Sequence, residues 1–333
     1  MKKILNNPVD YVDEMLGGMT AAHPEFYCLH GDSGRVIARS TASRAGKVGI
    51  VTGGGSGHLP VFAGYVGPGL LDACAIGDVF SSPSADQMAD AIRSADQGAG
   101  VLRLYGNYGG DIMNFDMAGD LVDFDGINCS TVVLADDVAS AKPEEAEKRR
   151  GVAGMVYAFK IAGAAADAGH NLADVTAVAQ KAADACRSIG VALSSCTVPQ
   201  AGKPTFTIGD DEMEMGMGIH GEPGVWRGKL RAADAISGEI MDRLLADMPL
   251  NKGDRVSVMV NSLGATPPEE LYIMYRIVRA RIEAAGATIV MPLVGRYATS
   301  MEMTGASVTL CKLDAQLEAF LKAPCDCAFW SVK

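Results

Sequence analysis

The run Thr52–Pro60 holds the residues of this chain that are best suited to binding a small polar ligand. Its sequence, TGGGSGHLP, places four glycines within positions 53–57, with Ser56 among them, and then His58. Residues without a Cβ atom let backbone N–H groups curl around a polar ligand, and a histidine can exchange a proton with it. Most glycine-rich loops are only turns. GGGSGH after the apolar run Val48–Val51 instead predicts a binding loop that leaves a buried strand, and it indicates polyol or phosphoryl chemistry.

A second histidine lies in a similar glycine-rich setting. Residues 212–220, EMEMGMGIH, alternate strictly, so they predict a strand with its methionines on one face and His220 on the other. Gly216 and Gly218 leave room beside His220 for a small ligand. A buried histidine satisfied by its neighbours is the competing interpretation, and the sequence leaves both open. The other three histidines have no such glycine frame: His23, His30 and His170.

Asp111 is the third candidate for chemistry. It ends the glycine-rich stretch 106–111, which follows a predicted strand at 100–105. There its carboxylate could accept a proton from a ligand hydroxyl. It could also cap the helix predicted to start at Ile112, because aspartate is a favoured N-cap, and both roles are compatible.

Two further polar groups receive a structural interpretation. Asp136 and Asp137 follow a predicted strand at 131–134, and a solvated turn explains them better than a hydroxyl or cation site. Thr266 is interpreted as the N-cap of a helix that starts at Glu269.

Several common motifs are absent from the sequence. The glycine run is not followed by GK[ST] and does not fit GxGxxG, so neither a Walker A motif nor a dinucleotide site is expected. There is no HExxH motif, no CxxC pair and no His/Cys/Asp cluster with metal-ligand spacing. The serine at 56 lacks the last glycine of a nucleophile elbow. We therefore expect no metal and no cofactor bound by this chain.

Composition limits the classes of partner. The formal net charge of −11 argues against nucleic acid or an anionic membrane surface, which require clustered Lys and Arg. No apolar run approaches the ~20 residues that span a bilayer, and the N-terminus lacks a signal-peptide core. The eight cysteines are interpreted as free thiols in a reducing compartment. These features predict a cytoplasmic globular protein.

The elements that must position the candidate residues follow an α/β pattern. Strands at 48–51, 100–105 and 131–134, with a helix at 113–124, predict a largely parallel sheet whose carboxyl ends share one rim. Further helices are expected at 1–20, 151–168 and 172–189. A second α/β unit is predicted from strands at 191–195, 255–260, 288–292 and 307–312 and a helix at 269–285. We divide the chain into an N-terminal domain, 1–189, with the glycine and aspartate loops, and a C-terminal domain, 190–333, with His220.

These motifs together resemble a known family, the substrate-binding subunit of dihydroxyacetone kinase, or Dak1-domain family. The resemblance runs over nearly the whole chain and rests on GGGSGH (53–58), NYGGDIMNF (107–115), RRGVAG (149–154), CTVPQAGKPTF (196–206), EMEMGMGIHGEPG (212–224), GDRVSVMVNSLGATPPEELY (253–272) and TSMEMTGASVTL (299–310). It implies a Dak1/DegV-like fold of two α/β domains, each a mixed, mostly parallel sheet flanked by helices.

The resemblance also implies a role for each candidate residue. His220 matches the histidine that adds to the ketone carbon as a hemiaminal, and His58 matches the second, acid-base histidine. Asp111 matches the aspartate that hydrogen-bonds the hydroxyl to be phosphorylated. Gly54, Gly55, Ser56 and Gly57 match the loop that holds the substrate. The implied activity is a phosphotransferase with an alcohol acceptor, a glycerone or ketose kinase.

One position departs from the family pattern. Lysine often precedes the Asn-Tyr of the aspartate loop and contacts substrate, whereas this chain has Gly106. The smaller residue is expected to enlarge the pocket, so a four-carbon ketose such as erythrulose becomes a candidate substrate.

The resemblance implies partners as well. The family's nucleotide-binding module is helical and carries closely spaced aspartates for magnesium, and nothing here matches it. A separate helical subunit is therefore expected to supply ATP or ADP with Mg, the ADP being recharged by the phosphotransferase system, and a homodimer is expected. The alternative is a ketose-sensing co-regulator of the same family. The presence of His58, Asp111 and His220 together favours catalysis, and a polar glycine-rich rim disfavours a fatty-acid-binding protein.

Overall fold

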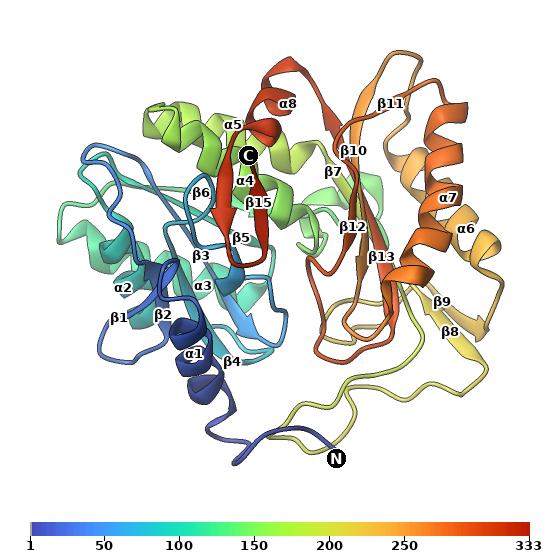
Figure 1. Cartoon of the computed structure of the whole chain (residues 1–333), viewed down its shortest axis with the longest axis horizontal. Helices are drawn as coiled ribbons and strands as arrows, with labels where there is room; N and C mark the ends of the chain where they lie inside the picture. The colour runs from blue at the N-terminus through green and yellow to red at the C-terminus, as the bar shows by residue number, and fades with distance from the viewer. Residues whose placement is uncertain (1) are drawn as a thin grey trace.

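Two β-sheets lie side by side in the computed structural model, which describes residues 2–333 (Figure 1). The first sheet has the order β1-β2-β4-β3-β5-β6. Its strands are β1 Tyr27–His30, β2 Val36–Arg39, β3 Gly49–Ser56, β4 Ala73–Val79, β5 Val101–Gly106 and β6 Cys129–Leu134. The β4-β3, β3-β5 and β5-β6 pairs are parallel and the β1-β2 and β2-β4 pairs antiparallel, which confirms a mixed, mostly parallel sheet.

Helices cover the first sheet on both sides. α2 (Ala85–Ala95) packs on β3 and β4, and α3 (Gly109–Asp123) packs on α2 and β5. α1 (Tyr11–Ala22) packs beside β1 and starts later than the predicted helix at 1–20. A capping box of Ser84 and Gln87 begins α2. The described chain also has short 3₁₀ turns at Ala63–Tyr65 and Pro143–Lys148.

The second sheet is mixed, but the expectation that it is mostly parallel is wrong. Its order is β11-β10-β13-β7-β8-β9, with β12 also paired to β10. Its strands are β7 Cys186–Ala192, β8 Glu212–Met215, β9 Trp226–Lys229, β10 Arg255–Ser262, β11 Thr288–Ile289, β12 Leu293–Gly295 and β13 Gly305–Leu313. Only β11 and β12 run parallel to β10; the four other pairs are antiparallel. Parallel neighbours require a helical crossover, which the direct β8–β9 connection does not provide.

The next four helices lie on the outer face of the second sheet or between the two sheets (Figure 1). α6 (Ala233–Asp247) and α7 (Pro268–Ala284) cover the outer face. α4 (Gly154–Asp167) packs on strands of both sheets and is buried over almost its whole length. α5 (Leu172–Asp184) packs on α4 and β6. The small residues of α4 therefore serve packing within the chain, as at Gly163, where a Cβ atom would meet the backbone of Leu70.

The second sheet starts earlier in the chain than predicted, with strand β7. The predicted helix at 172–189 ends at Asp184, and β7 begins at Cys186, earlier than the predicted strand at 191–195. The predicted boundary at residue 189 thus falls within β7. The C-terminal elements α8 (Ala315–Lys322), β14 (Cys325–Cys327) and β15 (Trp330–Val332) lie near the first half, where Trp330 joins a core with Tyr65.

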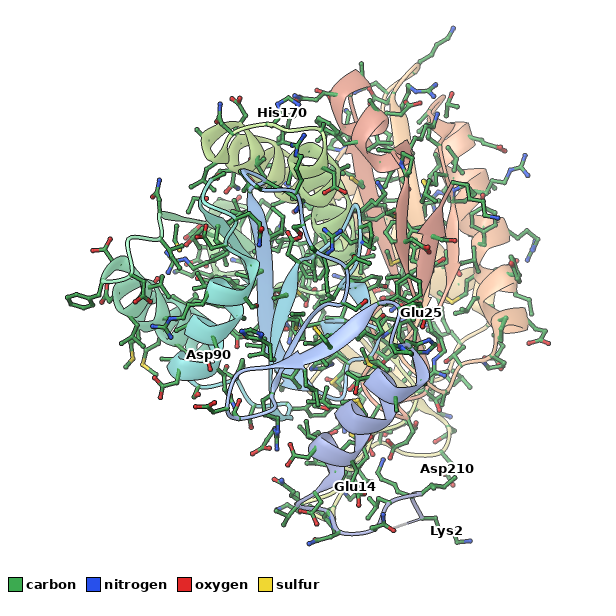
Figure 2. The ribbon with its side chains drawn as sticks, turned by 60° about the vertical axis from the view of Figure 1, so that its left-hand side comes forward. Lys2, Glu14, Glu25, Asp90, His170 and Asp210 are labelled. Carbon is green, nitrogen blue, oxygen red and sulfur yellow. The ribbon has the colours of Figure 1, made fainter. Side chains whose placement is uncertain are left out.

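Side chains fill the space between these layers, while charged residues such as Glu14, Glu25 and Asp210 lie on the outside (Figure 2). Within residues 2–333, no helix combines the length and the apolar character needed to cross a membrane.

Candidate active site

The glycine segment is part of a strand, which corrects the expected loop. Gly53, Gly54 and Gly55 continue β3 and pair with β4. Their missing side chains are needed for packing: a Cβ atom at Gly54 would overlap the Phe62 ring, and one at Gly55 would lie 2.6 Å from the backbone nitrogen of Ser81. Close approach of neighbouring groups explains these glycines better than a phosphate cradle. The chain turns only at Gly57, whose φ of +102° favours glycine.

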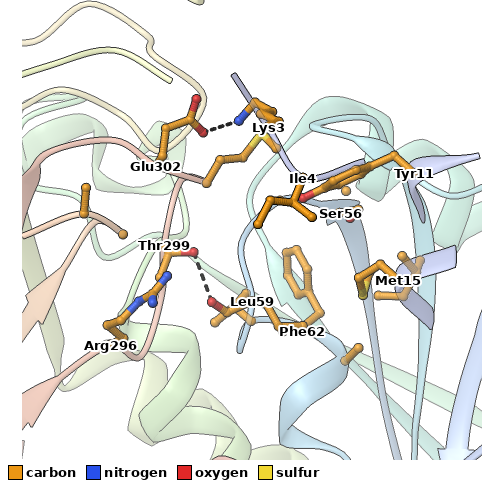
Figure 3. Close-up of a pocket in the computed structure, with 18 residues that line it drawn as sticks. Lys3, Ile4, Tyr11, Met15, Ser56, Leu59, Phe62, Arg296, Thr299 and Glu302 are labelled. Carbon is orange, nitrogen blue, oxygen red and sulfur yellow. Dashed lines mark hydrogen bonds and ion pairs between the residues drawn. The ribbon is translucent and has the colours of Figure 1, made fainter. Parts of the chain in front are cut away.

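The turn at Gly57 places His58 at the contact between the two halves of the molecule. His58 Nδ1 lies 2.7 Å from the carbonyl oxygen of Thr299. The Met301 N–H donates to the Gly57 carbonyl at 2.8 Å, and the Thr299 hydroxyl donates to the Leu59 carbonyl at 3.0 Å (Figure 3). The segment after β3 is thereby joined to the segment before β13, and His58 is buried there with 1% of its surface exposed.

His220 reaches His58 from the other half. β8 ends at Met215, because Gly216 has a φ of +82°, so the predicted strand to residue 220 is too long. The loop that follows carries His220, whose Nε2 lies 3.0 Å from His58 Nε2. The His220 side chain is one-quarter exposed (25%). The interpretation of His220 as an ordinary buried histidine is therefore not supported.

Glu222 completes the histidine pair, and the sequence reasoning missed it. Its Oε1 lies 3.0 Å from His220 Nδ1, and its Oε2 accepts the His220 backbone N–H at 2.9 Å. Burial alone would raise the pKa of Glu222, but the hydrogen bond and the charge of His220 outweigh it and lower this pKa to about 2. The available signal was the spacing His-x-Glu in a glycine-rich turn.

The buried position of His58 disfavours its charged form. Burial lowers the pKa of His58 to about 3, and the neighbouring charge of His220 adds to this effect. The hydrogen bond with Thr299 opposes the shift only in part. The His58 ring by itself is consequently neutral at pH 7.

Asp111 lies in the first turn of α3, and the alternative that it caps this helix is wrong. The N-cap is Tyr108, three residues before Asp111, and the N-cap makes no side-chain hydrogen bond to the helix. The Asp111 Oδ1 atom is buried without a hydrogen-bond partner among the described residues. Burial raises the pKa of Asp111 to about 6, although Ser82 and the charge of His220 favour the ionised form. An unpaired buried carboxylate oxygen that feels the charge of His220 is suited to accept a ligand hydroxyl.

Two aromatic rings surround the pair and were also missed. Phe80 stacks on His58 with 4.8 Å between ring centroids and lies 5.2 Å from His220. Tyr108 lies 4.9 Å from His220, edge to face. Phe80 has a φ of 59°, which is uncommon for a residue with a bulky side chain. This strained backbone holds an aromatic wall against both imidazoles.

The space beside Gly106 is filled, so the expected enlargement of the pocket is not seen at this position. A Cβ atom on Gly106 would lie 3.2 Å from the Gly151 carbonyl oxygen, the Met155 sulfur and Cε2 of Tyr108. Glycine here allows Tyr108 to pack down toward the strand.

Asp136 and Asp137 are buried, which corrects their interpretation as a solvated turn. Asp136 accepts the backbone N–H groups of Val152 and Gly154 at 2.8 and 2.7 Å, so it fixes the chain at the start of α4. Asp137 accepts Arg150 Nε at 2.9 Å, and an Arg150 nitrogen lies 4.0 Å from Glu222.

Thr266 is also not the predicted N-cap. Pro267 occupies that position, and the Thr266 hydroxyl donates to the Gly305 carbonyl and accepts its N–H at 2.8 Å.

A separate cavity of about 460 Å³ lies near the glycine strand (Figure 3). Gly55, Ser56 and Gly57 contribute to its lining, but the two histidines and Asp111 do not. Lys3 and Glu302, which form an ion pair, also contribute to its lining. A ketose held in this cavity alone would not contact His220. Among residues 2–333, no group of three His, Cys, Asp or Glu side chains could hold a metal ion.

The fold and site define a two-part α/β protein with a pair of contacting histidines between its halves. The Dak1 domain model matches residues 17–329, and the chain belongs to the Dak1 domain family. It is 46% identical, over 99% of its length and 100% of the relative, to the dihydroxyacetone-binding subunit DhaK of a PTS-dependent dihydroxyacetone kinase from Listeria innocua. It is 44% identical to an L-erythrulose kinase from Pectobacterium atrosepticum, covering 98% of this chain and 55% of that one.

Solved structures agree with this assignment. The dihydroxyacetone kinase of C. freundii superposes with a TM-score of 0.90 and 32% identity, over 99% of this chain and 60% of that one. The dihydroxyacetone kinase operon co-activator DhaQ gives 0.86 and 31%, over 94% and 96%. A DegV family protein from Thermus thermophilus, at 0.50 and 13%, shares the fold alone, over 80% of this chain and 100% of that one. The predicted family is confirmed.

Proposed function

We propose that this chain is the ketose-binding subunit of a kinase that phosphorylates dihydroxyacetone or a closely related ketose. The observation that carries the proposal is the contact of His220 with both His58 and Glu222 at 3.0 Å, together with the buried Asp111 carboxylate, on which the charge of His220 acts. Family membership and the names of the relatives agree with it.

In this proposal, His220 captures the substrate covalently. Its Nε2 adds to the ketone carbon to form a hemiaminal, while the histidine at 58 manages the proton of the carbonyl oxygen. Imidazole adds to a carbonyl but not to an alcohol carbon. Covalent capture therefore rejects glycerol, which hydrogen bonds alone discriminate poorly because its shape is so similar.

Asp111 then prepares the hydroxyl for phosphoryl transfer. Its unpaired Oδ1 accepts the hydroxyl proton of the captured ketose, and the pKa of about 6 leaves the carboxylate ionised at neutral pH. In this proposal, the substrate position is bordered by Gly54, Gly55, Ser56, Gly57 and Gly106. Fixed orientation relative to an incoming phosphoryl group supplies much of the catalysis in such reactions.

The phosphoryl donor belongs to a second, helical subunit that carries ATP, or ADP with Mg recharged by a phosphotransferase system. This is supported by the full-length match to a subunit named for dihydroxyacetone binding and by the 60% coverage of the C. freundii enzyme. We further propose a homodimer, and a cytoplasmic location in keeping with eight free cysteines.

Erythrulose is the second candidate ketose, because relatives at 42–44% identity are named erythrulose kinases. A co-activator role is the second candidate function, since DhaQ has a similar structure. The buried Asp111 carboxylate favours catalysis, because sensing a ketose needs no base for its hydroxyl.

The first experiment is carbon NMR with ketoses labelled at the carbonyl carbon. Dihydroxyacetone and erythrulose are mixed separately with the wild-type chain and with His220→Ala. Loss of the ketone signal and growth of a tetrahedral carbon signal in the wild type only is the expected result. A ketone signal that stays unchanged with both sugars would contradict the proposal.

A further inference from the structure

The hydrogen-bond partners of the two histidines determine where their ring protons must lie. His58 Nδ1 faces the Thr299 carbonyl oxygen at 2.7 Å, and a carbonyl oxygen can only accept, so this nitrogen carries a proton. His220 Nδ1 faces a carboxylate oxygen of Glu222 at 3.0 Å, which likewise only accepts when ionised. Both Nδ1 atoms are therefore N–H groups.

This assignment leaves the two Nε2 atoms facing each other at 3.0 Å. If both rings were neutral, both Nε2 atoms would carry lone pairs and would repel each other at hydrogen-bonding distance. One proton between them turns the contact into an N–H···N hydrogen bond.

We infer that the ligand-free histidine pair holds one proton between its two Nε2 atoms, and that this proton becomes the hydroxyl proton of the hemiaminal. Glu222 is then a positioning residue that fixes the tautomer of His220 and balances its charge. The inference rests on the proposed covalent capture, but it concerns the free protein and is measured without substrate.

The charged surroundings suit a cation on His220. Glu222 lies on the same loop, and Asp111 approaches from the first turn of α3. Arg150 opposes them from the segment before α4, but Asp137 pairs with it, and its nearest nitrogen is 4.0 Å from Glu222. The rings of Phe80 and Tyr108 complete the enclosure. His220 contacts the Glu222 carboxylate, whereas the buried His58 contacts a carbonyl oxygen, so the positive charge resides mainly on His220.

This one proton is sufficient for the capture step, in which atoms and charge are conserved. The His220 Nε2–H proton passes by way of His58 to the carbonyl oxygen, as the freed Nε2 lone pair attacks the carbon and the C=O π bond breaks. The product is a neutral hemiaminal hydroxyl on a ring that is alkylated at Nε2 and protonated at Nδ1. That ring keeps the single positive charge beside Glu222, and no external acid is consumed.

Nitrogen-15 NMR of histidine-labelled protein tests the inference directly. The chain has five histidines, so substituting His23, His30 and His170 by glutamine leaves two rings to assign. At pH 7 and without ketose, we expect three ring protons on these two rings: one on each Nδ1 and one shared between the Nε2 atoms. Two ring protons, with both rings neutral and one in the Nε2–H form, would overturn the inference.

A matched pair of variants tests the role of Glu222. Glu222→Gln keeps the size but removes the charge, so the shared proton should be lost at a lower pH than in wild type. The yield or rate of hemiaminal formation at pH 7 should fall about 10- to 100-fold, as is typical when an orienting partner is removed. Glu214→Gln removes another buried carboxylate of the same hairpin, which pairs with Arg227, and should leave the histidine spectrum unchanged.

The outcomes separate the two proposals. A wild-type hemiaminal signal together with only two ring protons rejects the shared proton but keeps the proposed function. Three ring protons that persist to the same pH in Glu222→Gln and wild type would reject the role of Glu222, whether or not the variant is fully stable.

Discussion

The two halves of the molecule contribute to the site in different ways. The mostly parallel first sheet holds His58 directly after the end of β3 and Asp111 in the first turn of α3, which follows β5, and both side chains are buried. The mostly antiparallel second sheet presents a hairpin loop, and its His220 remains one-quarter exposed. In the proposed mechanism, the first half thus supplies the fixed acid-base groups, whereas the second supplies an accessible nucleophile. A strand end is the more rigid support, while a loop leaves its histidine open to substrate.

The same contrast appears in the glycines of the two sheets. A Cβ atom at Gly55 in β3 would collide with the backbone at Phe80 and Ser81, whereas one at Gly190 in β7 would find its nearest neighbours at an ordinary 3.5 Å. At these two positions, the strand of the first sheet is packed more tightly than the strand of the second.

The largest effect is expected for the nucleophile of the second half. His220→Ala should abolish the hemiaminal signal and reduce ketose phosphorylation by roughly 10³-fold or more, since it removes the atom that bonds to substrate. His58→Ala should slow capture by roughly 10²- to 10⁴-fold but leave His220 able to react. Stopped-flow or NMR exchange measurements of capture compare the two. Equal and complete loss in both would contradict the division of roles.

The next effect tests the fixed carboxylate of the first half. Asp111→Asn should lower turnover by roughly 10²- to 10⁴-fold while hemiaminal formation persists, because the base acts after capture. Measuring capture and phosphorylation on the same preparation separates the two steps. Loss of capture itself would place Asp111 in the earlier step.

Asp111 should also have a pH signature in stability. Its folded-state pKa of about 6 lies above the ordinary value of 3.8, so the folded state binds the proton more tightly than the unfolded state. Its contribution to stability is complete below pH ~4 and is lost as pH rises through about 6. Asp111→Asn should then be more stable than wild type by about 1–3 kcal/mol at pH 7–8 and nearly equal near pH 4. Denaturant unfolding at several pH values measures this, and a pH-independent difference would contradict it.

The glycine contrast predicts a smaller effect on stability. Gly55→Ala should cost about 1–3 kcal/mol, since the clash is with backbone that cannot move aside. Gly190→Ala should change the free energy of unfolding by less than about 1 kcal/mol. Thermal unfolding of both variants provides the comparison. A similar change in the free energy of unfolding of both variants would show that these two strand positions are equally constrained.

The smallest effect concerns the contact between the halves. Thr299→Val removes the hydroxyl that donates to Leu59 at 3.0 Å and should cost about 0.5–1.5 kcal/mol. Because the Thr299 carbonyl still accepts from His58, the rate of capture should change little. A large loss of capture with unchanged stability would assign the hydroxyl a direct role.

The sequence by itself determined the family and the mostly parallel first sheet, and it singled out His58, Asp111 and His220 as the candidates for chemistry. Motif spacing and period-two hydrophobic runs are local properties, so they can be recognised without knowledge of the fold. Local reasoning failed where long-range contacts act. It assigned Gly53–Gly55 to a loop, although distant neighbours such as Phe62 require the absence of side chains within a strand.

Only the tertiary structure decided the rest. The antiparallel pairing of the second sheet and the early start of β7 depend on which strands meet, not on their composition. The burial of Asp136 and Asp137 depends on the segment before α4, which supplies their partners. The 3.0 Å contact between His58 and His220 joins residues far apart in the chain. Protonation follows such contacts, because burial and neighbouring charge set the pKa of each group.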